Sequence, residues 1–157
     1  MALYAEKIIP PEDLEGWRKQ IKGRLVTLNG SFDLLHAGHL QIIHEAKLQG
    51  DILLMALNSD SSIKKYKSPT RPIIPLEYRL EIVAALGDVD FVSWFEETDP
   101  IAFLTKVRPD VHVNGAEYGK ECIEAEVVRA LGGQIHIVNL KPGLSTTSII
   151  EKIRCEH

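Results

Sequence analysis

Short apolar runs alternate with longer amphipathic segments along most of the chain, and this alternation limits the possible folds more than any other feature. The runs are rich in Val, Ile and Leu, as β-strands are, whereas the segments between them repeat apolar residues at helical spacing. The predicted strands are residues 24–29, 51–58, 90–95, 110–114 and 134–139. The predicted helices are residues 38–49, 75–87, 99–107 and 121–132, with a flanking helix at 11–21 and a last one at 146–154.

This order of elements predicts an α/β protein with a Rossmann-like, doubly wound sheet of five parallel strands and helices on both faces. In such a sheet, ligands bind outside the carboxyl ends of the strands. We expect residues 1–23 to form an N-terminal helical extension and residues 24–157 to form a single domain. The proline-rich stretch 67–75 predicts an extended loop.

Composition argues against several classes of protein. The formal charge of −4 argues against a broad basic surface for nucleic acid. Cys122 and Cys155 are too few for a disulfide framework or a four-cysteine zinc site, which indicates a reducing compartment and a cytoplasmic location. No apolar run is long enough to cross a membrane, and the N-terminus lacks the apolar segment of a signal peptide. Small-molecule chemistry is therefore favoured.

The stretch NGSFDLLHAGH, residues 29–39, places two histidines three residues apart between a predicted strand and a predicted helix. If the strand ends near Asn29, then Gly38 lies at the start of the helix, where free backbone N–H groups and the helix dipole favour a phosphate. His36 from the loop and His39 from the first helical turn could donate to the same phosphoryl group. The stretch therefore predicts a phosphate site at the carboxyl edge of the sheet.

Other side chains of this loop are expected to shape it. Asp33 is expected to anchor the loop by accepting backbone N–H bonds, and Phe32 and Leu34 to pack beneath it. Zinc ligation is disfavoured, because His44 lies about 140° around the helix from His39 and no cysteine or acid completes a site. From spacing alone, a purely structural role for the two histidines stays open.

The residues GSFDLLHAGH resemble the HxGH signature of the nucleotidyltransferase superfamily, in the form shared by cytidylyltransferases and sugar-phosphate adenylyltransferases. The resemblance extends through ALNSDSSIKKYK, RPIIPLEYRLEIVAAL, RPDVHVNGAEY and GLSTTSIIEKI, which is nearly the whole chain beyond residue 23. The chain is most similar to the D-glycero-β-D-manno-heptose 1-phosphate adenylyltransferases, which form ADP-heptose for lipopolysaccharide. The resemblance implies transfer of AMP from ATP to a sugar 1-phosphate, with release of pyrophosphate.

The resemblance, together with the local chemistry, assigns a role to each candidate residue. Catalysis is assigned to His36, His39 and Lys67. Nucleotide binding is assigned to Asn29, Gly30, Ser31, Phe32, Gly38, His39, Asn114, Gly115, Ser145, Thr146 and Thr147, and substrate binding to Asp33, Lys64, Arg71 and Arg79.

Taken alone, three of these features have plainer interpretations. Residues 145–147 also fit a simple helix cap, and the basic run 64–71 a solvated charged surface. Arg79 also fits an exposed helix residue that pairs with Glu77 or Glu81. The sequence departs from many heptose adenylyltransferases at Asn114 and Glu117, where they carry lysine and aspartate, and this departure bears on the sugar more than on the reaction.

The implied reaction needs Mg²⁺ with ATP as substrate. A sugar phosphate oxygen is already ionised near neutral pH, so positioning and charge stabilisation suffice. Magnesium would be held by phosphate oxygens and water, so no metal-ligating side chains are expected. The implied partners are ATP, a sugar phosphate, a separate sugar kinase that supplies it, and further copies of the chain in a homo-oligomer, with no nucleic acid and no membrane.

Two alternatives remain at this stage. The chain could be a cytidylyltransferase that acts on glycerol 3-phosphate or a similar phosphoalcohol, since backbone groups near Gly115 could bind either adenine or cytosine. It could also be a regulatory module that binds a nucleotide without turnover. The absence of a GxxxxGK[ST] loop and of a GxGxxG after the first strand argues against P-loop kinases and NAD dehydrogenases.

Overall fold

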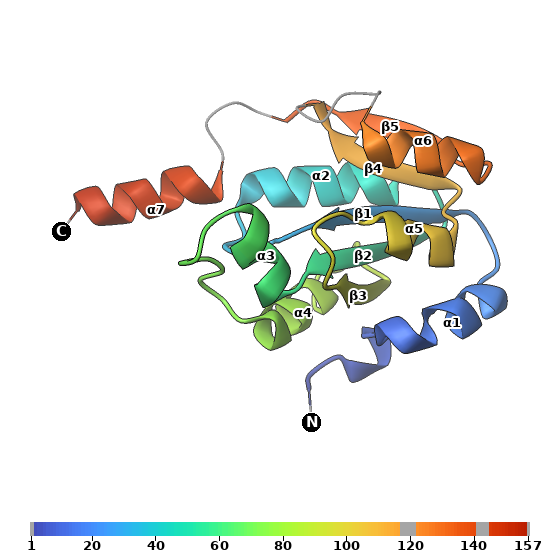
Figure 1. Cartoon of the computed structure of the whole chain (residues 1–157), viewed down its shortest axis with the longest axis horizontal. Coiled ribbons are helices and arrows are strands. Elements are labelled where there is room, and N and C mark those ends of the chain that lie inside the picture. The colour runs from blue at the N-terminus through green and yellow to red at the C-terminus, as the bar shows by residue number, and fades with distance from the viewer. Residues whose placement is uncertain (1, 117–121, 141–144, 157) are drawn as a thin grey trace.

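The predicted strands form one parallel sheet in the computed structural model, which describes residues 2–116, 122–140 and 145–156. The strands are β1 (Leu25–Gly30), β2 (Ile52–Asn58), β3 (Phe91–Phe95), β4 (Val111–Gly115) and β5 (Gln134–Val138). Their order across the sheet is β3-β2-β1-β4-β5, and every neighbouring pair is parallel. The chain therefore winds outward on both sides of β1, which confirms the Rossmann-like doubly wound sheet (Figure 1).

Helices cover both faces of this sheet. On one face lie α2 (Ala37–Lys47) and α4 (Leu76–Ala84); on the other lie α1 (Leu14–Gln20), α5 (Ile101–Val107) and α6 (Ile123–Ala130). Successive strand residues point to opposite faces, so Val26 and Leu53 join the core under α2 and α4, whereas Leu25 and Leu54 join the core under α1 and α5. Each face thus buries its own apolar layer, as expected for a sheet whose strands are apolar throughout.

Several elements differ from their predicted bounds. A further helix, α3 (Asp60–Tyr66), follows β2 and was not predicted; Ser59 begins it by accepting a hydrogen bond from Ser62 N. The helix predicted at 11–21 is a 3-10 turn, η2 (Pro11–Asp13), followed by α1. The last helix, α7 (Thr146–Cys155), projects away from the body of the molecule (Figure 1). No described helix has the length and apolar character needed to span a membrane.

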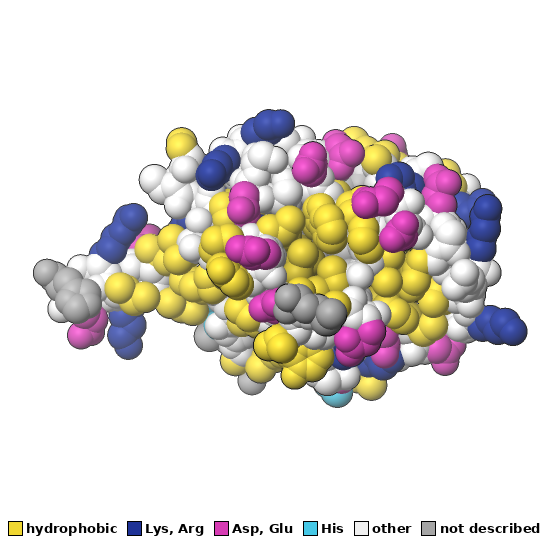
Figure 2. Space-filling view, turned by 90° about the horizontal axis from the view of Figure 1, so that it is seen from below, with side chains coloured by type: hydrophobic (Ala, Val, Ile, Leu, Met, Phe, Trp, Pro, Cys, Tyr) yellow, Lys and Arg dark blue, Asp and Glu magenta, His cyan; other side chains and the backbone are white. Residues whose placement is uncertain are grey.

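The N-terminal segment is held along the outer edge of β3. Ile8 forms an isolated parallel bridge with Val92, and Ile9 N donates to Val92 O at 2.8 Å. The ammonium group of Lys7 donates to the carbonyls of Ala84 and Val89, and this segment begins with a short 3-10 turn, η1 (Ala5–Lys7). Figure 2 shows this face, where apolar side chains gather beside acidic ones. A domain boundary at residue 23 stays a prediction.

Three aspartates fix the starts of the strands. Asp51 accepts a hydrogen bond from Arg24 N, Asp90 from Leu53 N and Asp110 from Leu25 N, at 2.7 to 2.8 Å. Each aspartate stands just before one strand and binds a backbone N–H within one residue of the start of the neighbouring strand. The side chains therefore join adjacent strands at the amino edge and leave the carboxyl edge free for a ligand site.

Candidate active site

A cavity of about 260 Å³ opens at the carboxyl ends of β1 and β4, where the winding of the sheet reverses. This is the position at which doubly wound sheets bind ligands. Its walls come from the β1–α2 loop, the start of α2, the end of α3, the end of β4 and the start of α7. All the residues predicted to be catalytic or nucleotide-binding line it: Asn29, Gly30, Ser31, Phe32, His36, Gly38, His39, Lys67, Asn114, Gly115, Ser145, Thr146 and Thr147.

The two histidines form one stacked unit at the start of α2. Their ring centroids are 3.9 Å apart and the ring planes differ by 29°. The Nδ1 atom of His36 accepts from Gly38 N at 3.1 Å, and the Nδ1 atom of His39 accepts from His36 N at 3.2 Å. Together they form a reciprocal cap of the helix in which histidines take the places usual for serine and glutamate. Both a structural and a chemical role are therefore built into the same pair.

This capping arrangement determines which nitrogen atoms can meet a ligand. Because both Nδ1 atoms accept backbone bonds, each neutral imidazole carries its proton on Nε2. Burial, aided by the nearby charges of His36 and Lys67, lowers the pKa of His39 to about 4, and burial also lowers the pKa of His36. Near neutral pH, the pair in the ligand-free protein consists of neutral Nε2–H donors rather than cations.

Positive charge is supplied from the opposite wall by Lys67. Its Nζ donates to Ser31 Oγ at 3.3 Å, just after the end of β1. Burial and the charge of Arg71 lower the pKa of this lysine, while Asp33 opposes the shift. Lys67 caps the carboxyl end of α3, so the unpredicted helix is what brings this lysine of the basic run to the cavity.

Phe32 forms part of the floor under the histidines. It is buried, its φ of 47° lies in the left-handed region, and its ring centroid is 5.3 Å from that of His39. A Cβ added at Gly30 would lie 3.0 Å from this ring, so the phenylalanine leaves little room for a side chain at that position. The expected packing of Phe32 beneath the loop is confirmed.

The start of α7 closes the cavity from a third side. Ser145 caps the helix by accepting from Ser148 N at 3.0 Å, and Thr146 Oγ1 donates to the carbonyl of Leu34 at 3.2 Å. The simple cap is therefore present, and it lies beside the β1–α2 loop rather than elsewhere on the surface. Two helix N-termini, of α2 and α7, border one cavity.

The β4 wall contains a buried polar column. Asn114 donates through Nδ2 to Cys122 Sγ at 3.2 Å, and His112, fully buried two residues earlier, lies 2.7 Å from Thr27 Oγ1 through Nδ1. Asn29 Oδ1 and His112 Nε2 are buried and have no hydrogen-bond partner among the described residues. Asn29 lines the cavity, and its side-chain oxygen is the unpaired polar atom on the β1 side of it among the described residues. Glu117 lies outside the described residues.

Asp33 and Arg79, predicted to bind substrate, do not line the cavity. Asp33 is buried and its two carboxylate oxygens accept from Ile73 N and Ile74 N at 2.8 Å. It therefore accepts backbone bonds, as expected, but from the 67–75 loop instead of its own. Arg79 is 1% exposed, so the interpretation as an exposed helix residue is wrong.

The guanidinium of Arg79 joins four segments. It donates to the carbonyls of Ser31, Asn58 and Ile74 at 2.8 Å, and to the carboxylate of Asp60 at 2.7 Å. These acceptors belong to the ends of β1 and β2, the 67–75 loop and the start of α3. In this structure Arg79 holds the loops that carry Ser31 and Lys67.

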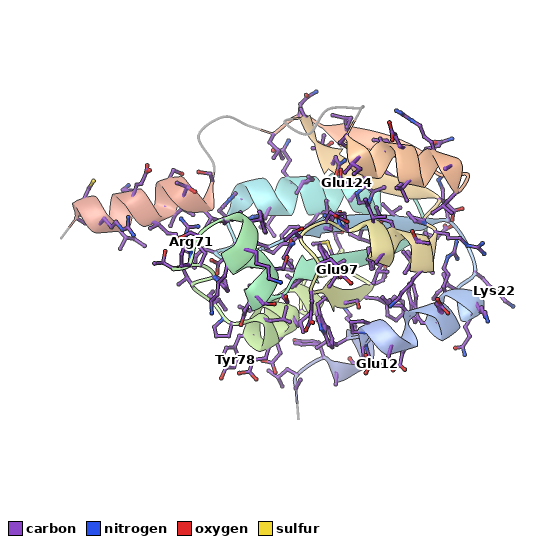
Figure 3. The ribbon with its side chains drawn as sticks, in the orientation of Figure 1. Glu12, Lys22, Arg71, Tyr78, Glu97 and Glu124 are labelled. Carbon is purple, nitrogen blue, oxygen red and sulfur yellow. The ribbon has the colours of Figure 1, made fainter. Side chains whose placement is uncertain are left out.

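Lys64 and Arg71 also lie outside the cavity lining. Lys64 is exposed on α3, and Figure 3 shows Arg71 on the loop between α3 and α4, toward the end of the molecule from which α7 projects. Their predicted contacts with a substrate stay predictions. Other lining residues were not predicted: Leu28, Ile42, Tyr66, Val113 and Leu140. Of these, Tyr66 could have been identified from the sequence, because it is the one aromatic residue within the basic run 64–71.

A larger cavity, of about 400 Å³, lies between η2, the end of β3 and α5. It is bordered by Glu12 and Glu97, labelled in Figure 3, and contains none of the predicted site residues. The smaller cavity is the candidate active site, because phosphate-binding donors converge there.

Among the described residues, no group of three or more His, Cys, Asp or Glu side chains could hold a metal ion. The donor set of the smaller cavity suits phosphate oxygens, not a bare cation.

Comparison with known proteins agrees with this geometry. The family model described as cytidylyltransferase-like matches residues 27–152. The chain is 44% identical over 134 residues to the bifunctional protein HldE of Pseudomonas syringae pv. tomato, and 44% identical over 132 residues to that of Azotobacter vinelandii. These matches cover 85% and 83% of this chain but only 28% of each relative, so the chain spans a little over a quarter of their length.

Two solved structures are also similar. The lipopolysaccharide core biosynthesis protein from Thermoplasma volcanium shares 29% identity with a TM-score of 0.62, over 76% of this chain and 98% of that one. The pantoate-beta-alanine ligase from Francisella tularensis, solved in complex with beta-gamma ATP and beta-alanine, shares 16% identity with a TM-score of 0.63, over 94% of this chain and 76% of that one. The second likeness concerns the fold alone.

Proposed function

The chain belongs to the cytidylyltransferase-like family of nucleotidyltransferases, and we propose that it transfers AMP from ATP to a sugar 1-phosphate, D-glycero-β-D-manno-heptose 1-phosphate. The observation that carries this proposal is the convergence of His36, His39, Lys67 and two helix N-termini on one cavity. The sugar is supported by the similarity to HldE and to a lipopolysaccharide core biosynthesis protein.

In the proposed reaction, an oxygen of the sugar phosphate attacks the α-phosphorus of ATP. A new bond forms between that oxygen and phosphorus, and the bond from the α-phosphorus to the bridging oxygen breaks, so pyrophosphate leaves with the electron pair. The attacking oxygen is already ionised, so no general base is needed. The chain's own residues have to orient the two phosphates and stabilise the charge that gathers on the transferred group.

The stacked histidines suit that task. Their Nε2–H groups, fixed by backbone bonds to Nδ1, are oriented before the ligand arrives and lose little freedom on binding. The Lys67 ammonium, beside Ser31, adds the full positive charge that neutral imidazoles lack. The amino ends of the α2 and α7 dipoles add partial positive charge from two more directions.

The acceptor phosphate and the nucleoside would occupy different ends of the cavity. Asn29 and Asn114 stand at the ends of β1 and β4 with apolar neighbours, an arrangement that suits a nucleoside. Magnesium would enter with ATP as part of the substrate, neutralise the leaving pyrophosphate and be held by phosphate oxygens and water. A sugar kinase activity, on this or another polypeptide, must supply the sugar 1-phosphate. We propose that the reaction takes place in the cytoplasm.

The test is pyrophosphate release with Mg²⁺, crossing ATP and CTP against heptose 1-phosphate and glycerol 3-phosphate. Release with ATP and heptose 1-phosphate is the expected result. Release with CTP and glycerol 3-phosphate would keep the mechanism and replace both substrates. Saturable nucleotide binding without pyrophosphate release, over a wide panel of acceptors, would instead indicate a regulatory module.

A further inference from the structure

One aromatic ring in the candidate active site has no part in the reaction proposed above. Tyr66 is the last residue of α3 and lines the cavity. It is 44% exposed, whereas Phe32, which lines the same cavity, is 6% exposed and forms part of its floor. A single exposed apolar residue elsewhere on the surface would need no explanation. An open ring on the wall of a cavity that also contains phosphate-binding donors is suited to contact a substrate.

The position of Tyr66 on α3 explains how its ring reaches the cavity. Residues three and four apart share one face of a helix, so Tyr66 lies on the same face as Ile63 and Ser62. Both of those residues are buried, which makes this the inner face of α3, whereas Lys64 and Lys65 are exposed. Because α3 ends at Tyr66, its inner face extends there beyond the packed core, and the ring borders the cavity.

The Tyr66 ring also lies close to the cation assigned to catalysis. The Lys67 ammonium is 5.7 Å from the centroid of the ring and 3.3 Å from Ser31 Oγ. A cation within about 6 Å of a ring centroid is attracted by the negative face of the ring. A phosphate bound by Lys67 would therefore bring the rest of its molecule within reach of the Tyr66 ring.

The order of the strands indicates which substrate meets this ring. Helix α3 follows β2, and β2 and β4 lie on opposite sides of β1. Figure 1 shows α3 and β4 on opposite sides of β1 as well. With the nucleoside beside Asn114 at the end of β4, as proposed above, the wall that carries Tyr66 and Lys67 is left for the acceptor.

We propose that Tyr66 determines acceptor specificity: the sugar ring of the acceptor stacks on the tyrosine ring while Lys67 binds the sugar's phosphate. A sugar ring presents C–H groups with partial positive charge, which complement the negative face of an aromatic ring. An acyclic phosphoalcohol such as glycerol 3-phosphate has no such ring face. This inference rests on the proposed function, because it takes a sugar 1-phosphate as the acceptor.

The experiment compares acceptor kinetics by pyrophosphate release with Mg²⁺ and ATP. Tyr66→Leu keeps an apolar side chain without the ring, and it is expected to raise KM for heptose 1-phosphate about threefold to tenfold and to change KM for ATP by less than about twofold. Tyr66→Phe restores the ring and is expected to recover the acceptor KM. Tyr78→Leu is the matched control, at a 53% exposed tyrosine of α4 that does not line the cavity.

A second acceptor distinguishes stacking from a merely structural role. If the ring only held Lys67 in place, Tyr66→Leu would weaken every phosphate acceptor equally. Stacking predicts that the variant weakens heptose 1-phosphate but not glycerol 3-phosphate, which is followed as an alternative acceptor or as an inhibitor of the sugar phosphate. Equal weakening of both compounds overturns the proposal. If Tyr66→Leu fails to fold by circular dichroism, Tyr66→Ala is the second variant for the same comparison.

Failure of the proposed function would give a different result. Calorimetric titration of heptose 1-phosphate into protein saturated with a non-hydrolysable ATP analogue measures acceptor binding without turnover. Binding that Tyr66→Leu weakens supports the assignment of Tyr66 even where no pyrophosphate is released, and the proposed function then fails alone. Wild-type acceptor affinity in a folded Tyr66→Leu protein overturns the assignment and leaves the proposed function intact. A wild type that does not bind heptose 1-phosphate overturns both.

Discussion

At the scale of single residues, the histidine pair shows how one side chain can cap a helix and still present an N–H donor to a cavity. Each imidazole uses Nδ1 to accept from a backbone N–H at the start of α2, from Gly38 N or His36 N, and keeps Nε2–H for the cavity. A threonine or serine side chain could also cap the helix, but it has no second polar group that could donate to the cavity as Nε2–H does. The two histidines stand three residues apart because they occupy the capping position and the third helical residue, whose side chains meet in a reciprocal cap.

Replacing His39 with alanine should lower kcat by about a hundredfold to a thousandfold, because one fixed donor to the transferred phosphoryl group is lost. The measurement is steady-state pyrophosphate release, with the thermal unfolding midpoint as a check on folding. Gln41→Ala, which removes an exposed bond to the carbonyl of Asn139, serves as a control on the same helix. Near-normal turnover by a folded His39→Ala protein would contradict the assigned role.

Arg79 is expected to act through other residues, because its donors are engaged by protein carbonyls and Asp60. Lysine at this position keeps the charge but cannot reach four acceptors in one plane. We expect Arg79→Lys to destabilise the fold by about 2–4 kcal/mol and to raise KM for the nucleotide by misplacing Ser31 and Lys67. Urea unfolding and steady-state kinetics below the unfolding range check both effects. Loss of stability with unchanged kinetics would restrict Arg79 to a structural role.

At the scale of elements, the aspartates that precede strands determine how neighbouring strands meet. Asp90 Oδ2 accepts from Leu53 N at 2.8 Å and from the Lys47 ammonium at 2.6 Å, so it joins β2, β3 and α2. We expect Asp90→Ala to cost about 1–3 kcal/mol in the free energy of unfolding, since a strand N–H loses its partner. Asp88→Ala, which removes an exposed pair with His44, should cost under about 1 kcal/mol. Equal costs in urea unfolding would refute the strand-joining role.

The elements also show what the sequence could predict. Strands appeared as apolar runs because both faces of the sheet are covered, and the histidine loop was found because strand, glycine and helix follow one another within residues 25–47. Helix α3 was missed because its short segment, DSSIKKY, is held by the Ser59 cap and by contacts distant in sequence, with little apolar periodicity of its own. The burial of Arg79 was missed for a similar reason: its acceptors are carbonyls, which a sequence pattern does not show.

At the scale of the whole molecule, His112 makes stability depend on pH. It is fully buried in the middle of the sheet, and burial lowers its pKa to about 4, while the neighbouring Asn114 side chain acts on the pKa in the opposite direction. In the unfolded chain an imidazole titrates near its ordinary value of about 6.5. Above that pH neither state binds the proton, whereas between about 6.5 and 4 only the unfolded state does. Stability should therefore be complete above pH 6.5 and fall as the pH drops toward 4.

The loss attributable to His112 amounts to about 3 kcal/mol across that range, and two substitutions isolate it. His112→Gln removes the titrating group, so its free energy of unfolding, measured in urea from pH 7 to pH 4.5, should fall less steeply than that of the wild type. Thr27→Val removes the partner hydroxyl, 2.7 Å from Nδ1, but keeps the buried imidazole. It should lower stability by about 1 kcal/mol at every pH and keep the wild-type slope. Parallel curves for wild type and His112→Gln would show that the sheet accommodates a charged His112, and acid sensitivity would then have to arise from other groups.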